Sequence, residues 1–182
     1  MSRFIDRGLD DLTPEQRAVA DEIIDGPRGN FSTPWKLLVE RPGLAQQMCR
    51  IGAYIRYENA LPNDLKELVI ITTARYWDAE YEWHIHSKLA ANEGIPADVI
   101  EAVRRNEDPS SVNPDILLVV RAARKLLNDH RLDDATFDAL VERFGREGTL
   151  DLAGTVGYYG LMAQMLNAFD VPVPEGAPKP FS

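Results

Sequence analysis

Cysteine is almost absent from this sequence, which contains Cys49 alone among its 182 residues. An intramolecular disulfide needs two cysteines, so none can form within one chain. The paired thiols of a Cys-x-x-Cys redox motif are excluded for the same reason. Cys49 stands in an apolar helical pattern, where a small buried hydrophobe is the simplest interpretation. Thiol chemistry through Cys49 alone stays open as an alternative.

Positive charge is also scarce. The chain has 20 Lys and Arg residues against 29 Asp and Glu, a net charge of -9. Nucleic-acid binding depends on Lys and Arg at the phosphates, and anionic membrane surfaces attract basic segments, so neither partner is expected. A small anionic substrate remains compatible with this composition, because a few local arginines are enough to bind one.

The sequence lacks an apolar segment that indicates export or a membrane span. Its first residues, MSRFIDRGLDDL, carry charges throughout and have no signal-peptide core, so we expect a cytoplasmic protein. Residues 152–169 have no charge over 18 positions but include three glycines, Gln164 and Asn167. Because of that polarity, we interpret them as a helix buried in protein or at a subunit interface.

Helical signals run along nearly the whole chain, and no convincing strand pairs are present. Thr13 followed by Pro14 is typical of a helix start, and residues 115–130 place apolar side chains at helical spacing. We predict an all-α fold, a single domain over residues 1–182, with an N-terminal helical extension (1–34) and an extended proline-rich tail (171–182). The predicted helices are 14–24, 35–40, 42–59, 62–77, 79–94, 96–105, 115–130, 133–144 and 150–169.

Two carboxylates and an imidazole surround the apolar run of residues 68–74. Glu67 precedes this run, and Glu82 and His86 follow it at i and i+4, on one face of a helix. A carboxylate that orients an imidazole and keeps it charged is a usual arrangement for acid–base catalysis. The simpler alternatives are a capping box, with Asp64 as N-cap and Glu67 at N3, and a surface pair of Glu82 with His86.

The neighbouring side chains suggest how a substrate is held. Arg75 is a candidate to bind an anionic oxygen, or it simply pairs with Asp78 or Glu80. Tyr81 belongs to an aromatic cluster that forms either core or the wall of a small pocket. His84 and His86 lie about 200° apart around a helix and cannot share a metal, so no metal site is predicted.

The pattern Glu67-x11-Ala79-x2-Glu82-x3-His86, followed by Ala90, Ala91 and Gly94, resembles the carboxymuconolactone decarboxylase family, also called AhpD-like. The redox branch of that family has cysteines where this chain has Ala79 and Glu82. The decarboxylase branch is similar to this chain in having Glu at the second position. Further segments, among them Gly157-Tyr158-Tyr159, resemble a longer subgroup without the Cys-x-x-Cys pair, and the likeness extends over roughly residues 9–175.

The resemblance implies an AhpD-like helical bundle, assembled as a homo-oligomer, either a trimer or hexamer or a dimer. It implies cofactor-free decarboxylation of a small anionic lactone, with catalytic residues Glu67, Glu82 and His86. We expect His86 to donate the proton, Glu82 to orient it, Glu67 to be a second acid–base group, and Arg75 and Tyr81 to bind substrate. The alternatives are a non-catalytic helical oligomer that binds a ligand, and a peroxiredoxin-type activity without the Cys-x-x-Cys pair.

Overall fold

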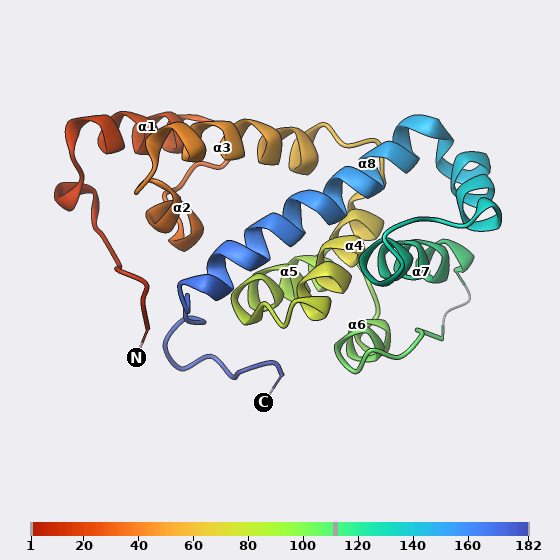
Figure 1. Ribbon diagram of the computed structural model, residues 1–182. Coiled ribbons are helices and arrows are strands. Elements are labelled where there is room, and N and C mark those ends of the chain that lie inside the picture. Colours follow the sequence, from red (N-terminus) through yellow and green to blue (C-terminus); the bar gives the residue numbers. More distant parts are fainter. Residues whose placement is uncertain (1, 111–112, 182) are drawn as a thin grey trace. The chain divides into compact units, whose positions relative to one another are not determined.

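The computed structural model describes residues 2–110 and 113–181, and within them every regular element is a helix (Figure 1). The predicted all-α fold is confirmed for this part of the chain. The elements are η1 (Leu9–Asp11), α1 (Pro14–Asp25), α2 (Thr33–Leu38), α3 (Pro42–Tyr57), α4 (Asn63–Tyr76), α5 (Glu80–Asn92), α6 (Ala97–Arg104), α7 (Pro114–Asn128) and α8 (Asp134–Ala168).

The chain forms two compact units. The N-terminal unit comprises Met1–Glu58 with Phe169–Val171, and the main unit comprises Asn59–Ala168 with Pro172–Ser182. The single domain over residues 1–182 stays a prediction.

In the N-terminal unit, α1 and α2 both pack against α3. The predicted start of α1 is confirmed by a capping box, in which Thr13 Oγ1 accepts a hydrogen bond from Gln16 N at 3.3 Å and Gln16 Oε1 accepts one from Thr13 N at 3.0 Å. The cap satisfies the N–H of Gln16, and Pro14 at the first helical position has no N–H to satisfy.

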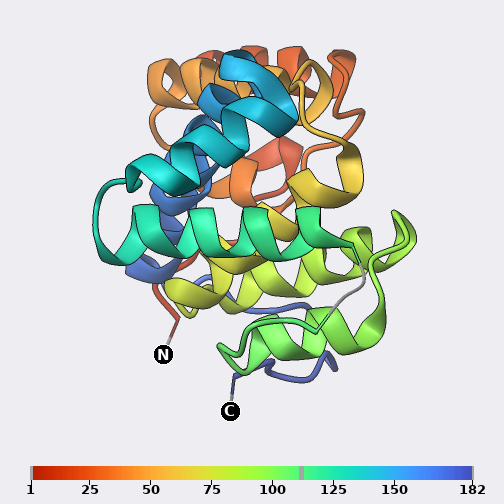
Figure 2. The same ribbon diagram turned by 90° about the vertical axis from the view of Figure 1, so that its right-hand side faces the viewer.

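The main unit is built around α4, which contacts α5, α6, α7 and α8 (Figures 1 and 2). Every residue of α4 from Leu65 to Ala74 is buried. A helix enclosed on all sides buries polar positions along with apolar ones, which explains the unbroken apolar run and places Lys66 and Glu67 inside the protein. Lys66 Nζ donates to Asn63 Oδ1 at 2.8 Å.

The long C-terminal helix α8 is interrupted at Gly145, whose φ of 70° and ψ of 174° lie in a region that essentially only glycine adopts. The sequence predicted two helices here, and the structure places the break between them at this residue. Of the three glycines at 154, 157 and 160, only Gly160 lies close to a neighbour: a Cβ there would sit 3.3 Å from Trp77 Nε1. Gly154 and Gly157 are exposed, so close packing explains only the third.

Among the described residues, no helix is both long and apolar enough to cross a bilayer. Residues 152–168 form the C-terminal part of α8 and contribute Leu152, Val156 and Ala163 to the core of the main unit. The buried face of this segment packs against α4 and α7, whereas residues 154, 157, 161, 164, 167 and 168 are exposed, so burial accounts for only part of its lack of charge.

Candidate functional site

A tight turn between α4 and α5 brings the candidate residues together. Asp78 adopts a left-handed conformation (φ 47°), and Ala79 N donates to Ala74 O at 2.9 Å, the pattern of a Schellman C-cap. The turn lets α5 fold back along α4, as the two helices do in Figure 1. As a result, Glu67 on α4 faces His86, which lies 19 residues later on α5.

Glu67 and His86 form a short, buried contact. His86 Nδ1 lies 2.6 Å from Glu67 Oε2, and the two residues are only 5% and 4% exposed. The capping-box alternative for Glu67 is wrong, because α4 begins at Asn63 and its N-cap, Pro62, receives no side-chain bond. Glu67 is the fifth residue of the helix, two residues past the capping-box position.

Glu82 lies at the other nitrogen of the same ring. Its Oε2 is 3.9 Å from His86 Nε2, and Glu82 is itself only 4% exposed. The alternative of a surface pair is therefore wrong, since both partners are buried. At 3.9 Å the two atoms are beyond hydrogen-bond distance, so Nε2 is held less tightly than Nδ1.

This arrangement places one imidazole between two carboxylates in a region shielded from water. Charge interactions are stronger there than in bulk water, and an imidazolium interacts favourably with both carboxylates. A ring held through Nδ1 keeps a fixed orientation and presents Nε2 for proton exchange. Of the two carboxylates, Glu67 lies within hydrogen-bond distance of the ring and Glu82 does not, while the predicted roles of the three residues in acid–base chemistry stay predictions.

Tyr159 of α8 is the aromatic contact of His86, which the sequence analysis did not single out. The two rings meet edge to face with centroids 4.9 Å apart and an interplanar angle of 80°. The ring of Tyr158 in turn meets that of Tyr159 edge to face, with the ring centroids 5.3 Å apart. The Gly157-Tyr158-Tyr159 segment was part of the resemblance, and that was the only signal in the sequence that these tyrosines matter.

A second group of polar residues holds the chain segment that precedes α4 against α8. Asp151 on α8 is buried, and its Oδ2 accepts a hydrogen bond from Ala60 N at 2.8 Å. Asn59 Nδ2 donates to Thr155 Oγ1 at 3.0 Å, one turn further along α8. Both bonds tie the residues just before α4 to α8, so they position the helix that carries Glu67.

The two predicted substrate-binding residues differ in their surroundings. Arg75 forms an ion pair with Asp78, and its Nε donates to Arg104 O at 2.6 Å. These contacts favour the alternative in which Arg75 pairs with Asp78. Tyr81 is buried on α5, and its role in binding substrate stays a prediction.

His84 and His86 have different surroundings. His84 Nε2 lies 2.8 Å from Lys88 Nζ, whereas His86 contacts Glu67. Burial and then the charge of Lys88 lower the pKa of His84 from its ordinary value of 6.5. Across residues 2–110 and 113–181, no group of three or more His, Cys, Asp or Glu side chains is arranged to hold a metal ion.

Comparisons with known proteins give a family match over part of the chain and a fold match over most of it. The family model described as the Carboxymuconolactone decarboxylase family matches residues 42–125. No curated protein matches the sequence.

Two solved structures share the fold. One is the alkylhydroperoxidase AhpD core of an uncharacterised peroxidase-related protein from Ralstonia eutropha JMP134, with a TM-score of 0.79 and 20% identity over 99% of this chain and 94% of that one. The other is a cysteine-to-alanine variant of the debrominase Bmp8 in complex with 2,3,4-tribromopyrrole, with a TM-score of 0.64 and 17% identity over 89% of this chain and 87% of that one.

Proposed function

We propose that this chain, whose residues 42–125 match the model of the carboxymuconolactone decarboxylase family, catalyses cofactor-independent decarboxylation of a small carboxylated lactone or a related acid. The observation that carries the proposal is the buried imidazole of His86, held between Glu67 and Glu82. Proton delivery to carbon is the one step of such a reaction that requires an acid–base group.

The reaction divides into two steps. The bond between carbon and the departing CO2 breaks, and its electron pair passes into the conjugated system to give a dienolate. The imidazolium form of His86 then gives its Nε2 proton to carbon, which leaves the neutral ring with its remaining proton on Nδ1 beside Glu67, and solvent returns a proton to Nε2. Because Glu67 occupies Nδ1, Nε2 is the nitrogen that meets the substrate, and Glu82 at 3.9 Å lies close enough to assist the return of the proton.

The residues at the two family motif positions support this reaction over thiol chemistry. Ala79 and Glu82 stand where the redox branch has cysteines, and Ala79 has no group able to attack a peroxide. Glu82 instead adds a second buried carboxylate to the site.

Release of CO2 from carboxymuconolactone tests the proposal. We expect turnover by the wild-type chain and a loss of about 100-fold or more in His86→Gln, the range for removal of an acid–base group. His130→Asn is the matched control, because His130 has a φ of 60°, which Asn tolerates. Equal rates for His86→Gln and His130→Asn, with circular dichroism showing both folded, would contradict the proposal.

Peroxide reduction is the second candidate, suggested by the half-exposed thiol of Cys49 and by the peroxidase-related structural neighbour. It requires a reductant: a hydroperoxide and a dithiol give an alcohol, water and a disulfide. The test is consumption of cumene hydroperoxide with dithiothreitol. Activity that disappears in Cys49→Ser and persists in His86→Gln would favour this candidate over decarboxylation.

A further inference from the structure

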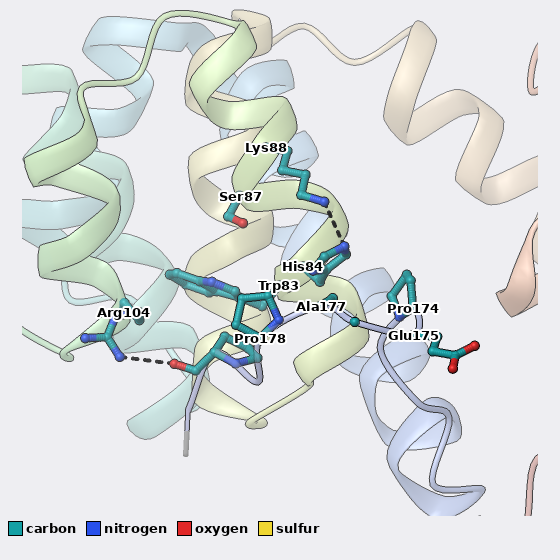
Figure 3. Close-up of a pocket in the computed structure, with 11 residues that line it drawn as sticks. Trp83, His84, Ser87, Lys88, Arg104, Pro174, Glu175, Ala177 and Pro178 are labelled. Carbon is teal, nitrogen blue, oxygen red and sulfur yellow. Dashed lines mark hydrogen bonds between the residues drawn. The ribbon is translucent and has the colours of Figure 1, made fainter.

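The main unit has a pocket on α5 that none of Glu67, Glu82 or His86 lines. Its volume is about 570 Å3, within the range of small-molecule sites. Four side chains of α5 line it (Trp83, His84, Ser87 and Lys88), together with Arg104 of α6 and residues 174–178 and Pro180 of the C-terminal tail (Figure 3).

The C-terminal tail forms one wall of this pocket, and contacts of its last residues hold it in place. Arg104 Nη1 donates to Pro180 O at 3.1 Å, and the ring of Phe181 packs edge to face on Trp83 with centroids 5.2 Å apart. The guanidinium of Arg75 lies 4.8 Å from the centroid of the Phe181 ring. A proline-rich tail secured in this way loses little entropy when a ligand binds, so it is suited to form a wall.

The polar side of the pocket presents hydrogen-bond donors. Lys88 carries three N–H groups, and one of them is directed at Nε2 of His84. Because Nε2 accepts from an ammonium group, the neutral ring of His84 carries its proton on Nδ1, which is a donor. Ser87 adds a hydroxyl group to the same lining.

The other charged residues of the lining do not cancel this positive site. Arg104 Nε and Nη2 are bound to Glu101 at 2.7 and 2.8 Å, so Arg104 acts as an anchor of the tail. Glu175 is the one acidic side chain of the lining, and Figure 3 shows its carboxylate turned away from Lys88 and His84. Lys88 is therefore the cation that a bound anion meets.

The remaining lining is apolar and flat. The indole of Trp83 and the rings of Pro174, Pro178 and Pro180 suit a planar hydrophobic body. We propose that this pocket binds a small aromatic carboxylate, with the ring against Trp83 and the tail prolines and the carboxylate at Lys88 Nζ. The site is separate from the His86 cluster, so its failure would leave the proposed reaction untouched.

Binding of benzoate to the full chain, measured by isothermal titration calorimetry, tests the site. We expect saturable binding of benzoate to the wild-type chain, and an affinity about tenfold or more lower in Lys88→Gln, because one charge-assisted hydrogen bond is lost. The neutral analogue benzamide should bind the wild-type chain with a similarly reduced affinity. Arg105→Gln removes the same charge from an exposed residue outside the lining and should stay within about twofold of wild type.

The location is tested by the indole N–H signals of the three tryptophans in 1H–15N spectra. Benzoate should shift the signal of Trp83 and leave that of Trp35, in the N-terminal unit, unchanged. Absence of saturable binding, equal affinities for Lys88→Gln and Arg105→Gln, or an unmoved Trp83 signal would each overturn the proposal.

Discussion

His86 Nδ1 lies 2.6 Å from Glu67 Oε2, a contact that joins α5 to the buried helix α4. Both partners of this contact are almost fully buried. The contact sets which nitrogen of the imidazole faces a substrate, so it connects the packing of the helices to the proposed chemistry.

The tautomer of neutral His86 follows from this contact. With Glu67 as the acceptor, the ring proton resides on Nδ1, and Nε2 carries the lone pair. Long-range 1H–15N spectra of the ligand-free protein should therefore show a protonated Nδ1 for this histidine. A neutral ring protonated on Nε2 would contradict the assigned role of Glu67.

Replacement of Glu67 by alanine should lower the free energy of unfolding by about 1–3 kcal/mol, because it leaves the buried Nδ1 of His86 without its acceptor. Urea denaturation measures the change. Glu142→Ala, at an exposed position of α8, is the control and should stay within about 0.5 kcal/mol of wild type. Equal effects would mean that the Glu67 contact contributes nothing to stability.

His84 should titrate with a midpoint below 6.5, because burial and then the charge of Lys88 lower its pKa. Below its pKa the ring becomes charged and can no longer accept from Lys88. Lys88→Gln should move the midpoint upward but leave it below 6.5, since burial is the larger cause and remains. The histidine Cε1–H signal followed between pH 4 and 8 gives both midpoints, and an unchanged midpoint in Lys88→Gln would contradict the contact.

The break in α8 predicts opposite effects for two glycines. Gly145→Ala should destabilise the protein by about 1–3 kcal/mol, because alanine is strained at a φ of 70° and ψ of 174°. Gly154→Ala, at an exposed helical position with nothing within 4 Å of a new Cβ, should stabilise it by about 1 kcal/mol. Thermal unfolding of both variants distinguishes them, and a Gly145→Ala variant at least as stable as wild type would show that glycine is not required at this break.

Much of the fold could be predicted because its signals are local. Thr13 and Pro14 start α1, and the predicted helix at 62–77 corresponds to α4 at Asn63–Tyr76. These positions depend on proline, glycine and capping chemistry, which act over a few residues. The break at Gly145 was placed only approximately, because the apolar pattern fades on both sides of it.

The structure places Glu67, Glu82 and His86 together, and their catalytic roles stay a prediction. The spacing of Glu82 and His86 indicated that these two share a helix face, but it did not indicate that Glu67 makes the shorter contact with the ring. Which carboxylate reaches Nδ1 depends on how α4 packs against α5, and no pattern within one helix encodes that. Tyr159, 73 positions after His86 in the sequence, meets it only through the packing of α8.

The most direct test of the account compares CO2 release from carboxymuconolactone by His86→Gln and Cys49→Ser, measured side by side with the wild-type chain. Proton transfer at His86 predicts that Cys49→Ser stays within about twofold of wild type, whereas His86→Gln falls about 100-fold or more. A folded His86→Gln variant with wild-type turnover, or a loss of activity in Cys49→Ser alone, would contradict it.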